Sequence, residues 1–345
     1  MASSIGPFGA VRETGSSGAA RSSGVSGSAG SPSAAGSLAP SGAFSSFARR
    51  GCTRRSVLTL AGIGAASLAL SGCVNQHPDR ASDGADELRL VATSPAAADI
   101  TDKLELDLVG VCSSSISTIP DRYAAATQVG TAMSPDLEVL KSLDPTYVIS
   151  PNSLQSDLQP KYAGAGLASI FLNLRSVDGM YKSIEGLGKK FDRQTQASQL
   201  IAEYNAFMDD YRDRNQGKES PRCLVLMGLP GSYIVATDNS YVGSLMALAG
   251  GTNVYQDTDM EFLNANTEDM KSKEPDIILR CAHALPDQVV QMFNEEFATN
   301  DIWRHFKAVE QGRVYDLPYA QFGMSAKFNY PDALETLQPI LYGEG

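Results

Sequence analysis

The sequence predicts an α/β protein in which one long α-helix joins two Rossmann-like lobes. Three observations predict this class. Strand and helix signals alternate from about residue 88, a purely helical stretch follows from Ser176 to Asn215, and the alternation resumes beyond Pro221. Strands that alternate with helices are typical of lobes with a largely parallel sheet. At 345 residues the chain is long enough for two such lobes.

The N-terminal part of the chain, residues 1–72, has a different composition. Up to residue 48 it is dominated by serine, glycine and alanine, which bury too little apolar surface to offset the entropy of ordering, so we expect disorder. Basic residues then precede an apolar run, Val57–Leu70, that is shorter than the roughly 20 residues a membrane-spanning helix needs. This pattern is typical of a secretion signal. It ends in Leu70–Cys73, which resembles a bacterial lipobox with Cys73 as the acylated residue, and Thr53–Leu58 resembles a twin-arginine export motif.

Removal of this segment changes the charge of the chain. The segment carries six arginines and one glutamate, so the formal net charge moves from −11 to about −16. Such a charge argues against nucleic acid as a partner and leaves membrane attachment to acyl chains rather than to a basic patch. The spacing of the remaining cysteines suggests neither a disulfide framework nor a zinc site, so we expect free and mostly buried thiols at Cys112, Cys223 and Cys281.

The exported chain divides into a tether, two lobes and a linker. We place the tether at 73–87, the N-terminal lobe at 88–190, the linker helix at 191–216 and the C-terminal lobe at 217–345. Within the linker, apolar residues recur at spacings of three and four and predict one buried stripe on a long helix. These residues are Leu200, Tyr204, Phe207 and Tyr211.

Short apolar runs predict the strands of both lobes. In the first lobe they are "LRLVATS", "LVGVCS", "TYVIS" and "ASIFLNL", and in the second "RCLVLMG", "SYIVAT", "DIILRC" and "GRVYDL". Ser94 and Pro95 supply a cap and a first-turn proline for a helix over 96–106. Further helices are predicted over 134–143 and 240–251, and a long helical stretch extends to about Val309.

Two segments of the chain match at an offset of 130 residues. "SPDLEVLKSLDPTYVIS" begins at Ser134 and "NANTEDMKSKEPDIILR" at Asn264, and both first residues are capping types. Glu138 matches Glu268, early in each helix, where the macrodipole favours an acidic residue. We therefore expect each lobe to use the same capped helix leading into a buried strand.

Enzyme motifs are scarce. The chain has no G-x-S-x-G, no P-loop and no H-E-x-x-H, and "MGLPGSY" resembles a phosphate-binding turn only loosely. Among the three histidines, His77 lies in the tether, and the aromatic neighbours of His305 favour a packed helix surface. His283 follows a buried strand, and ligands of α/β sheets collect at the carboxyl ends of strands. A structural histidine with satisfied hydrogen bonds is the alternative.

Met133 has a comparable position in the first lobe. It precedes the predicted helix start at Ser134, so it lies on a loop, although filling a core is the usual role of methionine. A thioether from one lobe and an imidazole from the other are a soft and a borderline ligand. Haem is the large, apolar, iron-containing molecule that accepts two such ligands on opposite sides.

From about Arg89 onward the chain resembles the haem-receptor lipoproteins of bacterial ABC importers, of the IsdE type. The motifs that carry the resemblance are "DRYAAATQVGT", "GTAMSPD", "MGLPGSYIVAT", "YVGSLMALAGGTNV", "NTEDMKSKEPDIILRCAH", "NDIWRHF", "GRVYDL" and "FGMSA". The resemblance implies a substrate-binding protein anchored by lipid to the outer face of the cytoplasmic membrane. It implies Met133 and His283 as the axial iron ligands, and Glu138 and Glu268 as the residues that dock onto arginines of a permease dimer. A cell-surface haem donor is a further partner that this interpretation allows.

The remaining site residues are placed by position alone. Arg122 and Tyr123 could donate hydrogen bonds to the haem propionates. Phe322 and Met324 could line a haem face, with core packing as the alternative. Cys281, two residues before His283, is expected to be a buried thiol rather than a competing iron ligand.

Three other kinds of function are alternatives for such a chain. A siderophore or cobalamin receptor on the same scaffold would ignore haem and use aromatic and basic side chains. A zinc or manganese receptor would need three or four converging ligands, yet the lobes hold only two histidines. An enzyme would need a nucleophile paired with a base, and none is evident.

Overall fold

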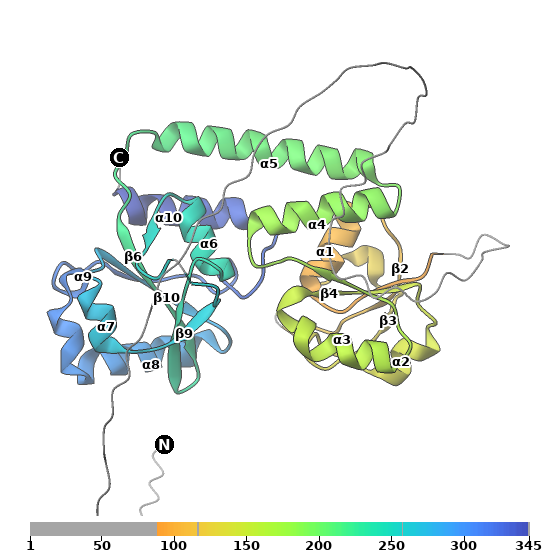
Figure 1. Cartoon of the computed structure of the whole chain (residues 1–345), viewed down its shortest axis with the longest axis horizontal. Coiled ribbons are helices and arrows are strands. Elements are labelled where there is room, and N and C mark those ends of the chain that lie inside the picture. The colour runs from red at the N-terminus through yellow and green to blue at the C-terminus, as the bar shows by residue number, and fades with distance from the viewer. Residues whose placement is uncertain (1–87, 116, 257, 344–345) are drawn as a thin grey trace, which may run out of the picture. The chain divides into compact units, whose positions relative to one another are not determined.

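The computed structural model describes residues 88–115, 117–256 and 258–343. The predicted signal, the lipobox at Cys73 and the tether with His77 lie outside these residues. The described chain forms two separate sheets, with the long helix α5 (Gln194–Asn215) between them in sequence (Figure 1). The predicted class, two α/β lobes joined by one long helix, is confirmed.

The first lobe holds a parallel sheet in the order β3-β2-β1-β4-β5. Its strands are β1 (Leu90–Ala92), β2 (Leu108–Val111), β3 (Thr127–Gln128), β4 (Tyr147–Pro151) and β5 (Ser169–Leu172). Its helices are α1 (Pro95–Lys103), α2 (Leu137–Ser142) and α3 (Gln155–Gly164), with the 3-10 turns η1 (Asp121–Tyr123) and η2 (Asn152–Leu154). The four predicted strands are all present. β3 and α3 were not predicted, because β3 consists of two exposed residues and α3 contains Pro160.

α1 begins where the sequence predicts. The Ser94 hydroxyl accepts a hydrogen bond from Ala97 N at 3.2 Å, and Pro95 occupies the first turn, where its missing N–H is not needed. Small side chains are buried on the helix face behind this cap. They allow α1 to lie close against the sheet.

The helix predicted over 134–143 starts two residues later than expected. Asp136, not Ser134, is the cap of α2, and its carboxylate accepts hydrogen bonds from Glu138 N at 2.9 Å and Val139 N at 3.1 Å. Ser134 instead closes a turn by donating its N–H to Thr131 O. In the second lobe the cap of α7 (Thr267–Ser272) is Asn266, not Asn264. Both expectations were wrong by two residues, so the 130-residue offset between the caps is kept.

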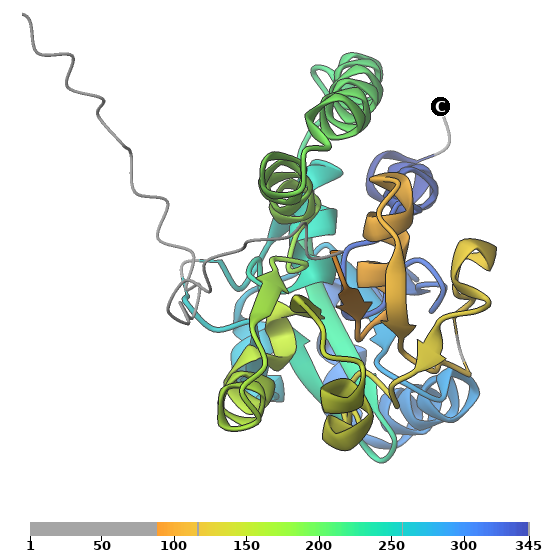
Figure 2. The same cartoon turned by 90° about the vertical axis from the view of Figure 1, so that its right-hand side faces the viewer.

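The helical stretch between the lobes consists of two antiparallel helices. α4 (Val177–Lys190) leads into α5, and Figures 1 and 2 show the two side by side. α5 falls within the linker range 191–216, while the domain boundaries as such remain a prediction. On its apolar stripe Tyr204 and Tyr211 are buried, and Leu200 and Phe207 pack against the core from half-buried positions. The predicted stripe is confirmed.

The second lobe holds a mixed sheet in the order β11-β10-β6-β7-β9, with β8 paired to β6. Its strands are β6 (Arg222–Leu229), β7 (Ser232–Ala236), β8 (Thr252–Asn253), β9 (Phe262–Asn264), β10 (Ile277–Ala282) and β11 (Val314–Asp316). Its helices are α6 (Tyr241–Leu248), α7, α8 (Pro286–Thr299), α9 (Lys307–Glu310) and α10 (Tyr330–Tyr342), with the 3-10 turn η3 (Asp301–His305). β7 runs antiparallel to β6, and the "MGLPGSY" segment forms the tight turn between them, with Gly231 at φ +82°.

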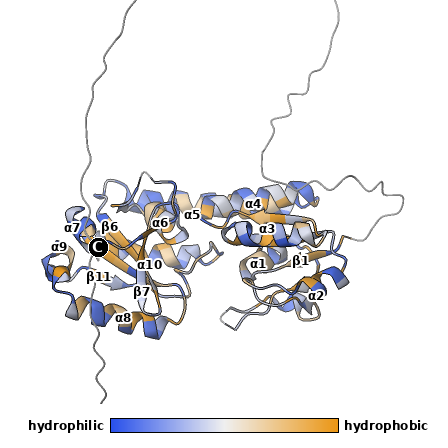
Figure 3. Ribbon diagram, turned by 60° about the horizontal axis from the view of Figure 1, so that its bottom comes forward, coloured by the Kyte–Doolittle hydropathy of each residue, from blue (hydrophilic) through white to orange (hydrophobic). Residues whose placement is uncertain are grey.

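α10 was not predicted, and it ties the second lobe to the linker. The Tyr330 ring lies 5.7 Å from the ring of Tyr204 in α5, and its hydroxyl lies 3.3 Å from that of Tyr181 in α4. One buried apolar cluster therefore extends from Leu90 in the first sheet through these helices to Leu334. In Figure 3 the strands carry much of the apolar colour, and polar residues gather on the outer faces of helices.

Candidate functional site

Met133 lies on a tight loop between β3 and α2. Its side chain is 72% exposed. Gly130 opens the loop at φ +89°, where a Cβ would approach Ser134 O to 2.8 Å, so the turn requires glycine. A backbone bridge between Gly130 and Pro135 closes the loop. The loop thus holds a methionine out in solvent at the carboxyl end of a parallel strand.

His283 directly follows the buried strand β10. Its backbone N–H donates to Gly228 O at 2.9 Å, which extends the parallel pairing with β6 by one residue. The imidazole is half-buried. Its Nδ1 is buried without a hydrogen-bond partner among the described residues. A structural histidine normally has both ring nitrogens satisfied or solvated, so His283 lacks the hydrogen bonds expected of a structural histidine.

Met133 and His283 occupy the same kind of position in their lobes. Both follow the carboxyl end of a strand that is parallel to its neighbours, which is where α/β sheets bind ligands. β3 is the edge strand of the first sheet, and β10 is the second strand of the other. Each lobe therefore carries, on such a loop, one side chain of a type that can bind a metal.

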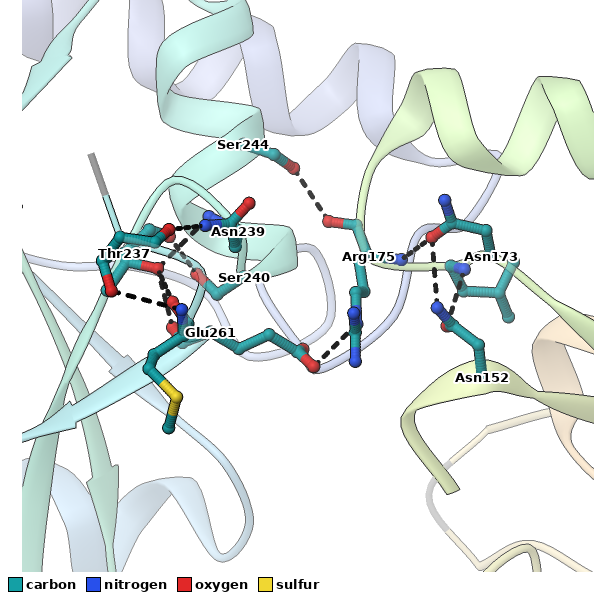
Figure 4. A network of polar contacts seen from close by, with 11 residues as sticks. Asn152, Asn173, Arg175, Thr237, Asn239, Ser240, Ser244 and Glu261 are labelled. Carbon is teal, nitrogen blue, oxygen red and sulfur yellow. Dashed lines mark hydrogen bonds and ion pairs between the residues drawn. The ribbon is translucent and has the colours of Figure 1, made fainter. Parts of the chain in front are cut away.

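A polar brace joins the lobes elsewhere. Arg175, shortly after β5, places Nε 2.7 Å from Glu261 Oε1 just before β9, and Arg175 O accepts a hydrogen bond from Ser244 at 3.0 Å (Figure 4). Asn173 and Asn152 support the Arg175 side of this network. Glu261 lies beyond the end of β7 that is far from the β6–β7 turn. At about 3.3 Å per residue, the length of β7 places the brace roughly 15 Å, measured along the strand, from the end of the sheet at which His283 lies.

A second contact between the lobes borders a cavity. Lys327, before α10, reaches Ser117 of the first lobe at 3.3 Å. The cavity has a volume of about 330 Å³, and its lining consists of Asp99, Asp102, Lys103, Ser117, Thr118, Lys327, Phe328 and Asn329. Burial raises the pKa of Asp99 to about 6, and the nearby Lys327 ammonium opposes that shift. Neither Met133 nor His283 lines this cavity, so we do not place the ligand in it.

The two residues predicted to meet propionates, Arg122 and Tyr123, are engaged within the first lobe. The Arg122 guanidinium lies 2.8 Å from Asp107, which raises the pKa of Arg122, and it also donates to Glu105 O. Tyr123 is buried, and its hydroxyl donates to Leu106 O at 2.8 Å. Burial raises the pKa of Tyr123 to about 12. Since this hydroxyl is used inside the core, Tyr123 is left without a role at the rim of the site.

Phe322 and Met324 differ in how far they are available. Phe322 is fully buried in the cluster that joins the lobes, so it is a core residue. Met324 is half-buried and packs against the same cluster. Only Met324 could therefore reach a ligand without repacking.

The three cysteines of the described chain are free and buried, as predicted. Burial, reinforced by Asp316, strongly raises the pKa of the Cys281 thiol. Because the thiolate rather than the thiol is the metal ligand, Cys281 does not compete with His283. Within the described ranges, no three His, Cys, Asp or Glu side chains converge in a way that could hold a metal ion.

The matching segments fold into the same helix–turn–strand unit. Glu138 and Glu268 are exposed in the first turns of α2 and α7, and Glu138 pairs with Lys141 at 3.1 Å. Asp144 and Glu274 adopt left-handed φ values of 42° and 51° after the helices. An arginine then binds the carbonyl at the end of each helix. Arg89 Nη2 donates to Leu143 O at 2.8 Å, and Arg222 Nη2 donates to Lys273 O at 2.6 Å.

Comparisons with known proteins agree with this architecture. A family model described as periplasmic binding protein matches residues 90–320. "High-affinity heme uptake system protein IsdE" of Staphylococcus aureus strain Newman is 40% identical over 257 residues, which is 74% of this chain and 88% of that protein. A solved ABC transporter substrate-binding protein from Listeria monocytogenes EGD-e is 46% identical with a TM-score of 0.72, covering 75% of this chain and 100% of its own.

The structure of S. aureus IsdE complexed with heme is 40% identical with a TM-score of 0.70, and the match covers 74% of this chain and 100% of that one. The resemblance that the motifs carry is thus confirmed. These relatives are substrate-binding transport proteins rather than enzymes. The fold, the extent of the family match and the degree of identity lead to one conclusion: the chain belongs to the periplasmic binding protein family.

Proposed function

We propose that this chain is an exported haem receptor that delivers haem to an ABC permease, and that Met133 and His283 bind the iron from opposite sides. The observation that carries the proposal is the 40% identity, along most of both chains, with a protein named for heme uptake and solved with heme. The site adds independent support. A solvent-exposed methionine and an imidazole with an unsatisfied buried nitrogen lie on loops that follow the carboxyl ends of parallel strands, one in each lobe.

The chemistry of the two side chains suits a porphyrin iron. Thioether and imidazole are known axial ligands of haem, and together they leave no coordination position open. Methionine side chains are usually stabilised by burial, but Met133 is exposed. Binding to iron would explain why a methionine occupies this exposed position. Burial of several hundred square ångströms of porphyrin between the lobes contributes on the order of 10 kcal/mol before ordering costs.

Attachment and delivery complete the proposal. Acylation of Cys73, after export through the signal, would hold the receptor at the outer face of the cytoplasmic membrane. Glu138 and Glu268 would dock onto arginines of the permease dimer, because they lie exposed at equivalent positions of the two lobes. Among the predicted pocket residues, Met324 stays a candidate for a haem face, and Arg122 could meet a propionate only by leaving Asp107. A cell-surface haem donor would be a further partner.

A titration with ferric haem tests the proposal directly. The purified chain should bind one haem with the absorption spectrum of a six-coordinate, low-spin iron. Met133→Ala and His283→Ala should each convert this spectrum toward five-coordinate, high-spin iron. Each should weaken binding at least tenfold, or about 1.4 kcal/mol, because one iron bond is lost.

Matched controls separate ligation from general effects. Met260→Ala removes another exposed methionine, and His305→Ala another histidine of the same lobe; both should leave the spectrum unchanged. A chain that ignores haem but binds cobalamin or a ferric siderophore in parallel titrations would assign it to that alternative. Haem binding with a spectrum insensitive to both Met133→Ala and His283→Ala would contradict the assigned ligands.

A further inference from the structure

Leu285 is an exposed apolar residue beside the proposed iron ligand. Large apolar side chains are exposed at only a few of the described positions, namely Leu88, Met133, Met260, Leu285 and Val290. Leu285 is 54% exposed and follows His283 by two residues. One exposed leucine needs no explanation by itself, but the backbone of this one is also unusual.

Leu285 adopts the left-handed conformation, with φ 48° and ψ 61°. Apart from glycine, the described residues with positive φ are Glu105, Asp144, Asp192, Glu274 and Leu285, and the other four carry carboxylates. The left-handed region brings Cβ close to the carbonyl oxygen in any residue except glycine. Pro286 follows directly, and a residue before proline favours extended backbone. Leucine is therefore an unfavourable choice for this turn on local grounds.

The turn is fixed in place by its surroundings. On one side, the His283 N–H is bonded to Gly228 O of β6. On the other, Leu285 O accepts hydrogen bonds from Gln288 N at 3.0 Å and Val289 N at 3.1 Å in the first turn of α8. A Cβ on Gly228 would come within 2.3 Å of Val289, so α8 lies directly on β6. The backbone at Leu285 thus has little freedom to relax, and its side chain is held in an exposed position two residues after His283.

We propose that Leu285 forms an apolar wall against the porphyrin face on the His283 side of the site. This inference rests on the proposed function and adds a residue that touches the bound haem. A strained residue that also exposes an apolar side chain is typical of a binding site, where the ligand supplies the missing contact. The flat apolar face of a porphyrin beside the iron ligand is a surface that a leucine at this position would cover. Neither a polar residue nor glycine, both better suited to the backbone, would give that contact.

Substitutions at Leu285 separate the side chain from the turn. Leu285→Gly and Leu285→Asn both suit left-handed backbone, and they remove the apolar contact. Both should speed haem dissociation roughly 3- to 10-fold, because part of the buried apolar area of one leucine is lost. The rate is measured by transfer of haem to excess apomyoglobin. The six-coordinate spectrum should persist, since both iron ligands remain. Leu285→Met should restore the dissociation rate to within about twofold by replacing the contact.

Stability and a matched control complete the experiment. The haem-free Leu285→Gly chain should melt no lower than the wild type, because glycine relieves the left-handed strain. Leu88→Asn alters an exposed leucine before the amino end of β1, away from the carboxyl edge, and should leave dissociation unchanged. Unchanged dissociation in both Leu285→Gly and Leu285→Asn would overturn the role of Leu285 alone. A wild-type chain that binds no haem would overturn the proposed function, and this inference with it.

Discussion

Asp136 and Asn266 show how a helix start is decided at the residue scale when several capping residues are near. In each segment a capping residue stands two positions before the one that is used. Ser134 donates its N–H to Thr131 O, and the Gly130–Pro135 bridge holds the chain extended at that point. Residue types alone do not show which of two nearby capping residues starts the helix, because this depends on a turn that closes before the helix begins.

The caps give a prediction with internal controls. Asp136→Ala removes the acceptor of two helix N–H groups, and Asn266→Ala the acceptor of one. Each substitution should lower the free energy of unfolding by about 1 kcal/mol. In a chain of this size that is a fall in melting temperature of roughly 2–4 °C. Ser134→Ala and Asn264→Ala should change it by less than about 0.5 kcal/mol. Equal effects of all four substitutions in thermal denaturation would contradict the assignment of the caps.

The candidate site was predictable to different degrees, residue by residue. His283 is recognisable because it follows a predicted strand, and Met133 because it stands on a loop before a predicted helix. Leu285 was not, because a leucine before proline predicts extended backbone and gives no sign of positive φ. The buried positions of Tyr123 and Phe322 depend on contacts with distant segments, which a local pattern does not contain.

Among the secondary-structure elements, burial decided what could be predicted. β6 and β10 are buried along nearly their whole length, and such continuous apolar runs are the strongest strand signal. α10 contains Pro339 in its interior and has no side chain that caps its start, so these local signals argue against a helix. Its stability comes from packing, as the Tyr330 contacts with Tyr181 and Tyr204 show.

The brace at Arg175 gives a prediction about an element contact. Glu261→Gln removes the charge that faces Arg175. We expect faster amide hydrogen exchange around residues 173–176, since the turn into α4 loses its tie to the second lobe. The melting temperature should fall by no more than about 2–4 °C, because a partly exposed ion pair contributes roughly 0–1 kcal/mol.

A comparable pair within one element serves as the control for the brace. Glu185→Gln breaks the half-exposed pair with Lys189 inside α4. It should leave exchange at residues 173–176 unchanged. If both variants exchange at the wild-type rate there, the Arg175–Glu261 pair does not restrain the turn.

At the scale of the whole molecule, contacts between segments far apart in sequence set the relation between the lobes. The Lys327–Ser117 contact joins residues 210 positions apart, and the brace and the tyrosine cluster are similarly remote. No sequence pattern pairs such residues. The sequence could therefore predict two lobes and a linker, but not how the lobes contact each other.

The cavity beside Lys327 makes stability depend on pH. Asp99 has its pKa raised from 3.8 to about 6, mainly by burial. Between these values the unfolded chain binds fewer protons at Asp99 than the folded chain, so the free energy of unfolding falls as pH rises through this window. Asp99→Asn should therefore be more stable than wild type at pH 7, by on the order of 1 kcal/mol after solvent screening.

The same comparison at lower pH checks the sign. Near pH 4 the folded Asp99 is protonated, so the advantage of Asp99→Asn should largely disappear. Melting temperatures of both proteins across this range provide the measurement, and Asp121→Asn, at an exposed position, serves as control. Parallel pH curves for wild type and Asp99→Asn would show that Asp99 does not carry the effect.

The repeated helix–turn–strand unit has a consequence for the direction in which cargo is held. At the 130-residue offset, Glu138 falls on Glu268, but Met133 falls on Leu263 and His283 falls on Ser153. A two-fold symmetric transporter would thus meet like with like, whereas a porphyrin would face sulfur on one side and nitrogen on the other. Rotating the receptor by half a turn about the axis that relates its lobes would exchange the sulfur and the nitrogen. Under the proposed ligation, the docking residues are therefore two-fold symmetric, whereas the two faces of the bound haem are distinguishable.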